Sequence, residues 1–239
     1  MKLGIVQAGS VQSALQLTER ALKGGARVVL LPKDWTVSID LVPVSEFQKL
    51  AKLFTAHVVI GAVFDGVSIV SPIITPDGNV VGLSKKIYVS DKSVLPGTEL
   101  VAFKSMGNKF GILIDDDLLY SELVLAYLKS NVDVVLVPSS VPASTLDWWK
   151  GLLKARAIET RMTFVNANLF VPPKGGGRSS IAEPTVASGK SDAALIEILG
   201  EEEGYAVIEV DTNRTLQLRA LRMSEYREVG VRFLDDQSR

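Results

Sequence analysis

The chain contains no cysteine and only one histidine, His57. Without thiols it can form no disulfide, no thiolate metal site and no thiol nucleophile. A single imidazole also excludes a zinc site built on several histidines. His57 begins the apolar stretch "HVVIGAVF", where a lone histidine is far more often structural than catalytic. We therefore expect no metal and no cofactor.

The sequence also lacks an excess of one charge and any long hydrophobic run. Lysine and arginine number 26 against 27 acidic residues, for a net charge of −1, which gives no electrostatic reason to expect nucleic acid or an anionic membrane as partner. No apolar run approaches the roughly 18 residues that span a bilayer. The opening "MKLGIVQAGS" lacks the charged and hydrophobic regions of a signal peptide. We expect a cytosolic protein.

Patterns of helical and strand periodicity alternate along the 239 residues, of which 47% are hydrophobic. Short apolar runs such as "KLGIVQ", "ARVVLLP" and "VDVVLVPSS" predict buried strands, and the last third of the chain predicts short strands and turns. No linker, repeat or low-complexity segment divides the chain, so we expect a single α/β domain over 1–239. The predicted helices cover 10–25, 44–56, 117–130 and 145–162.

One predicted strand ends on three consecutive acids, in "GILIDDDLLYSEL". A strand that leads directly into a helix holds such side chains rigidly. Adjacent side chains of a strand point to opposite faces, so Asp115, Asp116 and Asp117 are poorly arranged to share one metal ion. The residues themselves leave open an acid–base site or the remains of a different active site.

Several segments, in order and spacing, resemble the nitrilase, or carbon–nitrogen hydrolase, superfamily over nearly the whole chain. None of these segments is decisive by itself, but the ordered set is specific. The resemblance implies a four-layer α-β-β-α sandwich whose subunits pair through outer helices. The segments are "KLGIVQ", "ARVVLLP", "GNVVGLSKKIY", "LPGTEL", "KFGILIDDDLLYSELVLAYL", "VDVVLVPSS", "WWKGLLKARAIETRMTFVNAN" and "GRSSIAEP".

The same resemblance identifies a degenerate catalytic triad. Family members use a glutamate as general base, a lysine that stabilises the oxyanion and a cysteine nucleophile. The corresponding positions here are Lys33, Lys86 and Asp115, so the lysine is kept while the glutamate and the cysteine are replaced. The further candidates for lining the pocket are Asp91, Asp116, Ser139 and Trp149.

These replacements compensate each other in charge. If the fold is kept, Asp115 lies within reach of Lys33, Lys86 or both, which favours its ionised form. A structural ion pair in a retired active site is the favoured interpretation, and it predicts a role in binding, regulation or assembly, with a small molecule as a candidate ligand. The alternative is an amide hydrolase in which Asp115 attacks while Lys86 holds the oxyanion, or in which Lys33 acts as a base.

The predicted helices add two structural expectations. Asp117 precedes Leu118 and is expected to cap the helix that begins there. The helices at 117–130 and 145–162 carry more apolar surface than one sheet face covers, which predicts a homodimer or a higher homo-oligomer. The residues that provide this surface are Leu123, Tyr127, Trp148 and Leu152.

Overall fold

Two β-sheets stacked face to face form the centre of the molecule in a computed structural model, which describes residues 1–230. Strands of the first sheet lie in the order β15-β1-β2-β3-β5-β4, and β6 pairs with β5. The bounds are β1 Lys2–Gln7, β2 Val28–Leu30, β3 His57–Val59, β4 Val63–Phe64, β5 Ile69–Ile74, β6 Val80–Lys85 and β15 Gly204–Glu209.

The second sheet has the order β14-β13-β10-β9-β8-β7, and a short ribbon, β11–β12, lies apart from both sheets. In each sheet three neighbouring strands run parallel, β1-β2-β3 and β8-β9-β10. The bounds are β7 Ala102–Ser105, β8 Asn108–Ile112, β9 Val134–Ser139, β10 Thr163–Asn168, β11 Phe170–Val171, β12 Gly175–Gly176, β13 Ser180–Ala187 and β14 Lys190–Glu197.

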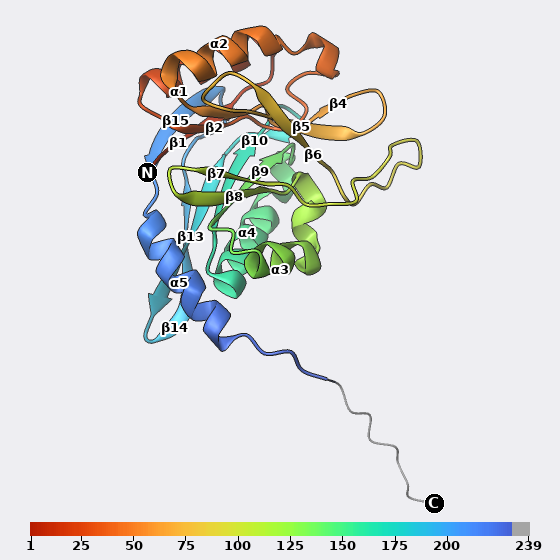
Figure 1. Ribbon diagram of the computed structural model, residues 1–239. Coiled ribbons are helices and arrows are strands. Elements are labelled where there is room, and N and C mark those ends of the chain that lie inside the picture. Colours follow the sequence, from red (N-terminus) through yellow and green to blue (C-terminus); the bar gives the residue numbers. More distant parts are fainter. Residues whose placement is uncertain (231–239) are drawn as a thin grey trace, which may run out of the picture.

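Helices cover the outer faces of both sheets (Figure 1). Helices α1 and α2 lie over the first sheet, α3 and α4 lie over the second, and α5 packs against β13 and α3. Three short 3₁₀ turns, η1 to η3, lie between these elements. The bounds are α1 Val11–Lys23, α2 Val44–Phe54, α3 Ser121–Lys129, α4 Leu146–Thr160, α5 Thr212–Glu225, η1 Ile39–Leu41, η2 Asp115–Leu119 and η3 Ala143–Thr145.

Three buried apolar layers hold this arrangement together. Phe47 belongs to the layer between α1, α2 and the first sheet, Phe110 to the layer between the sheets, and Leu153 to the layer under α3 and α4. Burial of apolar area contributes roughly 25 cal/mol per Å², so each layer ties its two neighbours together. The predicted α-β-β-α sandwich is confirmed.

The helix predicted over 117–130 is wrong in its first turn. A 3₁₀ turn occupies Asp115–Leu119, and α3 starts only at Ser121 because Tyr120 is extended, with φ −93° and ψ 102°. Helix α5 was not predicted, and the short strands expected in the last third include a hairpin, β13–β14, of eight residues in each strand. Within residues 1–230, no helix has the length and hydropathy of a membrane span.

Candidate functional site

Lys33 follows β2 at the point where the two sheets meet. It forms a parallel bridge with Ala62, and its backbone N–H donates to the Ser139 carbonyl of the other sheet at 3.2 Å. Gly61 permits this close approach, because its φ is +74° and a side chain there would collide with the Pro32 carbonyl. The backbone therefore fixes Lys33 from both sides.

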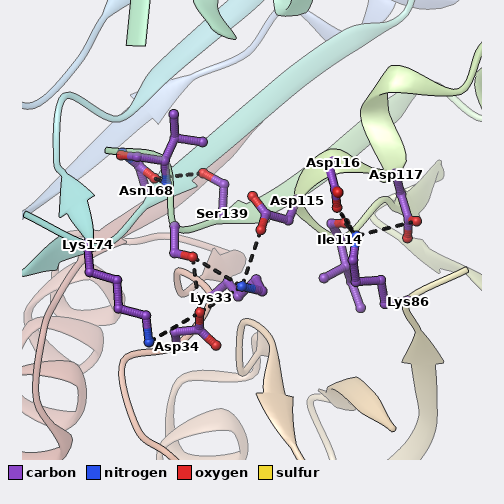
Figure 2. Close-up of polar contacts among 12 residues, drawn as sticks. Lys33, Asp34, Lys86, Ile114, Asp115, Asp116, Asp117, Ser139, Asn168 and Lys174 are labelled. Atoms are coloured by element: carbon purple, nitrogen blue, oxygen red, sulfur yellow. Dashed lines mark hydrogen bonds and ion pairs between the residues drawn. The ribbon is translucent and has the colours of Figure 1, made fainter. Parts of the chain in front are cut away.

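The ammonium group of Lys33 is surrounded by oxygen atoms (Figure 2). Its Nζ lies 2.7 Å from Asp34 Oδ2, 3.1 Å from Ser140 Oγ and 3.2 Å from Asp115 Oδ2. Ser140 in turn donates its hydroxyl to Asp34 at 3.0 Å, and the Lys174 ammonium approaches the same carboxylate at 3.4 Å. Five polar side chains thus form one connected network.

Asp115 adopts an uncommon backbone conformation. Its φ is +56°, in the left-handed region, where non-glycine residues are infrequent and cost local conformational energy. This conformation begins η2 and turns the carboxylate toward Lys33, as Figure 2 shows. The expected ion pair between Asp115 and at least one of the two lysines is confirmed for Lys33.

Lys86 pairs with the other two acids of the triplet. Its buried Nζ donates to the Ile114 carbonyl at 3.1 Å and to Asp116, and it lies 3.6 Å from Asp117 Oδ1. Lys86 forms no ion pair with Asp115 in the described part of the chain. The three consecutive acids are therefore divided between two lysines, one acid to Lys33 and two to Lys86.

Asp117 is buried and structural, but the expectation that it caps a helix is wrong. Its carboxylate accepts the backbone N–H groups of Ile87 at 3.0 Å and Tyr88 at 2.8 Å. Because η2, rather than an α-helix, follows the strand, the carboxylate binds this loop instead of capping a helix. Burial raises the pKa of Asp117, although Lys86 and the two N–H groups oppose this effect.

The titration properties of Lys33 and Asp34 follow from their contact. Burial acts to lower the pKa of Lys33, but Asp115 and Asp34 outweigh it and raise the pKa above its ordinary value. Burial likewise acts to raise the pKa of Asp34, but Lys33 and Lys174 prevail and the pKa is lowered. Each group is held in its charged form, so neither is suited to accept a proton at neutral pH.

A pocket of about 220 Å³ opens beside these ion pairs. Asp91 and Asp116, two of the four pocket candidates, line it. Its lining consists of Lys33, Ile69, Lys86, Val89, Ser90, Asp91, Val94, Asp115 and Asp116. Among residues 1–230, no group of three or more histidine and acidic side chains is arranged to hold a metal ion.

The other two pocket candidates, Ser139 and Trp149, do not line the pocket and were assigned wrongly. The Ser139 hydroxyl is fully buried and donates to Asn168 Oδ1 at 2.9 Å. The Trp149 indole is buried under α4, with its N–H 3.3 Å from Asn166 Oδ1. Both side chains satisfy buried amides of β10 because an unpaired amide there would be costly.

Three residues of the network were missed from the sequence: Asp34, Ser140 and Lys174. Asp34 and Ser140 are the direct neighbours of predicted positions, in "LPKDW" and "VPSS", and this adjacency was an available signal. Lys174 lies in the turn between β11 and β12. Nothing local marks it, because its contact with Asp34 spans distant parts of the chain.

Comparisons with known proteins were made by sequence and by structure. No family model matches the chain. The 2-oxoglutaramate amidase of Bacillus subtilis (strain 168) is 26% identical over 221 residues, covering 81% of this chain and 82% of the amidase. The deaminated glutathione amidase of Dictyostelium discoideum is 38% identical over 86 residues, covering 35% of this chain and 29% of that protein.

Solved structures resemble most of the chain. Saccharomyces cerevisiae Nit3, a member of branch 10 of the nitrilase superfamily, matches with a TM-score of 0.77 at 20% identity, covering 92% of this chain and 93% of Nit3. A mutant of the amidase from Nesterenkonia sp. AN1, with acrylamide added at its active-site cysteine, matches with a TM-score of 0.72 at 20% identity, covering 94% and 98%. At these identities the structures establish the shared fold.

Proposed function

We propose that this chain, whose fold and sequence matches support membership of the nitrilase superfamily, binds a small molecule in the pocket beside Lys33 and Asp115 without hydrolysing it. The observation that carries the proposal is the ion pair of 3.2 Å between these two residues. It lies where the resemblance would place the general base and the nucleophile. A carboxylate neutralised in this way is a weak nucleophile.

The chemistry around the ion pair supports the same proposal. The Nesterenkonia amidase has an active-site cysteine, whereas this chain contains no cysteine. The raised pKa of Lys33 and the lowered pKa of Asp34 leave both groups charged. Neither can serve as an efficient general base for water, and the raised pKa of Lys33 makes its ammonium group a poor donor of a proton to a leaving amine. Binding, regulation or assembly then remains as the role of the pocket.

Self-association belongs to the same proposal. Trp148 on α4 and Leu119 in η2 are 58% and 40% exposed, and Leu123 and Leu152 beside them are partly buried. An apolar surface of this kind favours a two-fold contact between copies. Tyr127, which the sequence predicts on this surface, is instead buried, and its hydroxyl donates to the Val101 carbonyl at 2.8 Å.

A hydrolase remains the second candidate, and one observation favours it. Asp115 combines a left-handed backbone with a place on the pocket wall, and strained residues cluster at active sites. In that mechanism the Asp115 carboxylate attacks an amide carbonyl while Lys86 stabilises the oxyanion. The C–N bond then breaks as the leaving nitrogen takes a proton from water, and hydrolysis of the acyl anhydride restores Asp115. Against it, Lys86 is already occupied by Asp116, Asp117 and the Ile114 carbonyl.

Release of ammonia from simple amides tests the two candidates. The substrates are 2-oxoglutaramate, named for the Bacillus subtilis relative, and propionamide, both primary amides whose hydrolysis releases ammonia. We expect no release above a protein-free blank from the native chain. Turnover by the native chain that disappears in Asp115→Asn, but persists in the matched surface variant Asp147→Asn, would establish the hydrolase. Asp147 is a suitable control because its side chain is 94% exposed.

A further inference from the structure

The lysine ammonium groups that face the pocket are already surrounded by protein oxygens. A lysine ammonium has three hydrogen-bond donors and no acceptor. Lys33 Nζ has three oxygen neighbours, at 2.7, 3.1 and 3.2 Å. Lys86 Nζ donates to the Ile114 carbonyl and to Asp116, and Asp117 Oδ1 lies 3.6 Å away as an ion-pair partner. An anionic ligand would therefore compete with protein oxygens for either ammonium.

The carboxylates of the pocket wall, in contrast, keep free acceptors. An ionised carboxylate accepts about four hydrogen bonds. Within the described residues, the side chain of Asp115 makes one polar contact, its ion pair with Lys33. The side chain of Asp116 likewise makes one, with Lys86. Their side chains are 19% and 52% exposed, and both line the pocket. The remaining hydrogen-bonding capacity of the pocket is therefore for donors.

The net charge of the site is negative, which also favours a positively charged donor. The lysines of the pocket and its network carry +3, and the aspartates carry −5, for a sum of −2. In a partly buried site such a sum favours a bound cation. The lysines are Lys33, Lys86 and Lys174, and the aspartates are Asp34, Asp91, Asp115, Asp116 and Asp117.

The size and walls of the pocket limit the ligand further. Its volume of about 220 Å³ is below the roughly 300–1,000 Å³ of pockets for drug-sized ligands. The side chains of Ile69, Val89 and Val94 form its apolar part. This combination suits a short alkyl body that carries one strong donor group at the end near Asp115.

From lysines already paired with protein oxygens, free carboxylate acceptors and negative charge, we infer that the pocket takes a small organic cation, a primary ammonium ion with a short alkyl chain. This inference rests on the proposed function, since it names the ligand class of the same pocket. The ammonium group donates to the free oxygens of Asp115 and Asp116, and the alkyl chain packs against the valines. Such a site offers acceptors to a cation, whereas a site that stabilises an oxyanion offers donors to an anion.

Calorimetric titration of the intact chain tests the ligand class at constant ionic strength. Three probes of the same chain length differ in charge: propylammonium, propionate and propionamide. We expect propylammonium to bind at least tenfold more tightly than either of the others. Asp115→Asn should weaken its binding at least tenfold, whereas Asp147→Asn should leave it unchanged. Asp116→Asn provides a second variant should Asp115→Asn fail to fold.

The other outcomes separate this inference from the proposed function. Tighter binding of propionate or propionamide would overturn the cation inference and leave a ligand-binding pocket in place. Binding of none of the probes, or propylammonium binding that neither Asp115→Asn nor Asp116→Asn weakens, would also overturn it. Release of ammonia from propionamide during the titration would instead overturn the proposal that the chain does not hydrolyse its ligand.

Discussion

Asp115 has two opposing effects on the stability of the fold. Its left-handed backbone, with φ +56°, costs conformational energy, and its ion pair of 3.2 Å with Lys33 offsets part of that cost. Lys33 does not depend on Asp115 for neutralisation, because Asp34 lies closer, at 2.7 Å. The site is therefore a shared network in which Lys33 and Lys86 are each held by two acids.

We expect Asp115→Ala to destabilise the fold, but by less than the loss of an isolated buried pair. Breaking such a pair costs about 3–5 kcal/mol, and the contact that Lys33 keeps with Asp34 should reduce the loss to about 2 kcal/mol. Denaturant unfolding followed by circular dichroism measures this, with Asp147→Ala as the exposed control. An Asp115→Ala midpoint equal to that of the native chain would show that the ion pair contributes no stability.

His57 lies away from the pocket and gives a separate test at the residue scale. It is buried, contacts the tilted ring of Phe103 with ring centroids 5.1 Å apart, and has an Nδ1 without a hydrogen-bond partner among residues 1–230. Burial lowers the pKa of His57, and Asp77 opposes this only in part. The neutral ring is thus favoured in the folded state and plays a packing role.

The sign of the pH dependence follows from this lowered pKa. Below about pH 6.5 the unfolded chain takes up a proton at His57 that the folded chain resists. The free energy of unfolding should therefore fall as the pH drops from 6.5 toward the folded pKa. His57→Phe keeps the ring contact and should remove this part of the slope in unfolding curves between about pH 7.5 and 5.5. Parallel curves for the two proteins would contradict the prediction.

At the scale of elements, the expected helices and strands were predicted best where a periodic apolar face packs on a sheet. α1 and α2 lie within the predicted ranges 10–25 and 44–56, and α4 within 145–162. Their buried faces show the helical spacing that the sequence displays. The prediction failed at η2, where ion pairs and a tight turn, rather than periodicity, decide the backbone.

Helix α5 was not predicted from the sequence for a different reason. Its attachment is polar: Arg219 donates to Asp133 at 3.0 Å and to Asn131 at 2.7 Å, and Thr215 contacts Thr163 at 2.8 Å. A helix that is held by such bonds lacks the apolar stripe from which helices are recognised in a sequence. Its partners lie in the loop before β9 and in β10, far along the chain.

At the scale of the whole molecule, the exposed surface of the outer helices predicts contact with a second copy of the chain. We expect light scattering at micromolar concentration to give twice the mass of the 25.8 kDa chain, because α3 and α4 expose Trp148 beside partly buried leucines. Trp148→Glu should shift the mass toward the monomer by placing a charge in that contact.

Leu53 on α2 provides the matched control for this experiment. It is 74% exposed on the opposite outer layer, so Leu53→Glu introduces the same charge without touching α3 or α4. A dimer that dissociates with Leu53→Glu and survives Trp148→Glu would place the contact on the α1–α2 side. A native chain that scatters as a monomer would contradict the prediction of self-association.

The sequence by itself determined which chemistry is absent and which segments carry a buried face, whereas the layered sandwich was predicted from the family resemblance. A chain without cysteine has no thiol nucleophile, and apolar periodicity marks the buried faces of strands and helices because it records burial along a local segment. The resemblance of local segments predicted that Lys33, Lys86 and Asp115 share one site. All three line the same pocket, and Lys33 pairs with Asp115.

Only the tertiary structure decided which charges pair. Lys33 takes Asp115 and Lys86 takes Asp116 and Asp117, because the left-handed turn at Asp115 directs its side chain away from its two neighbours. Ser140 and Lys174 complete the network from segments far from Lys33 in the sequence. Ion pairs of this kind depend on distances between distant segments, and those distances are set by loop conformation and layer packing rather than by any local pattern.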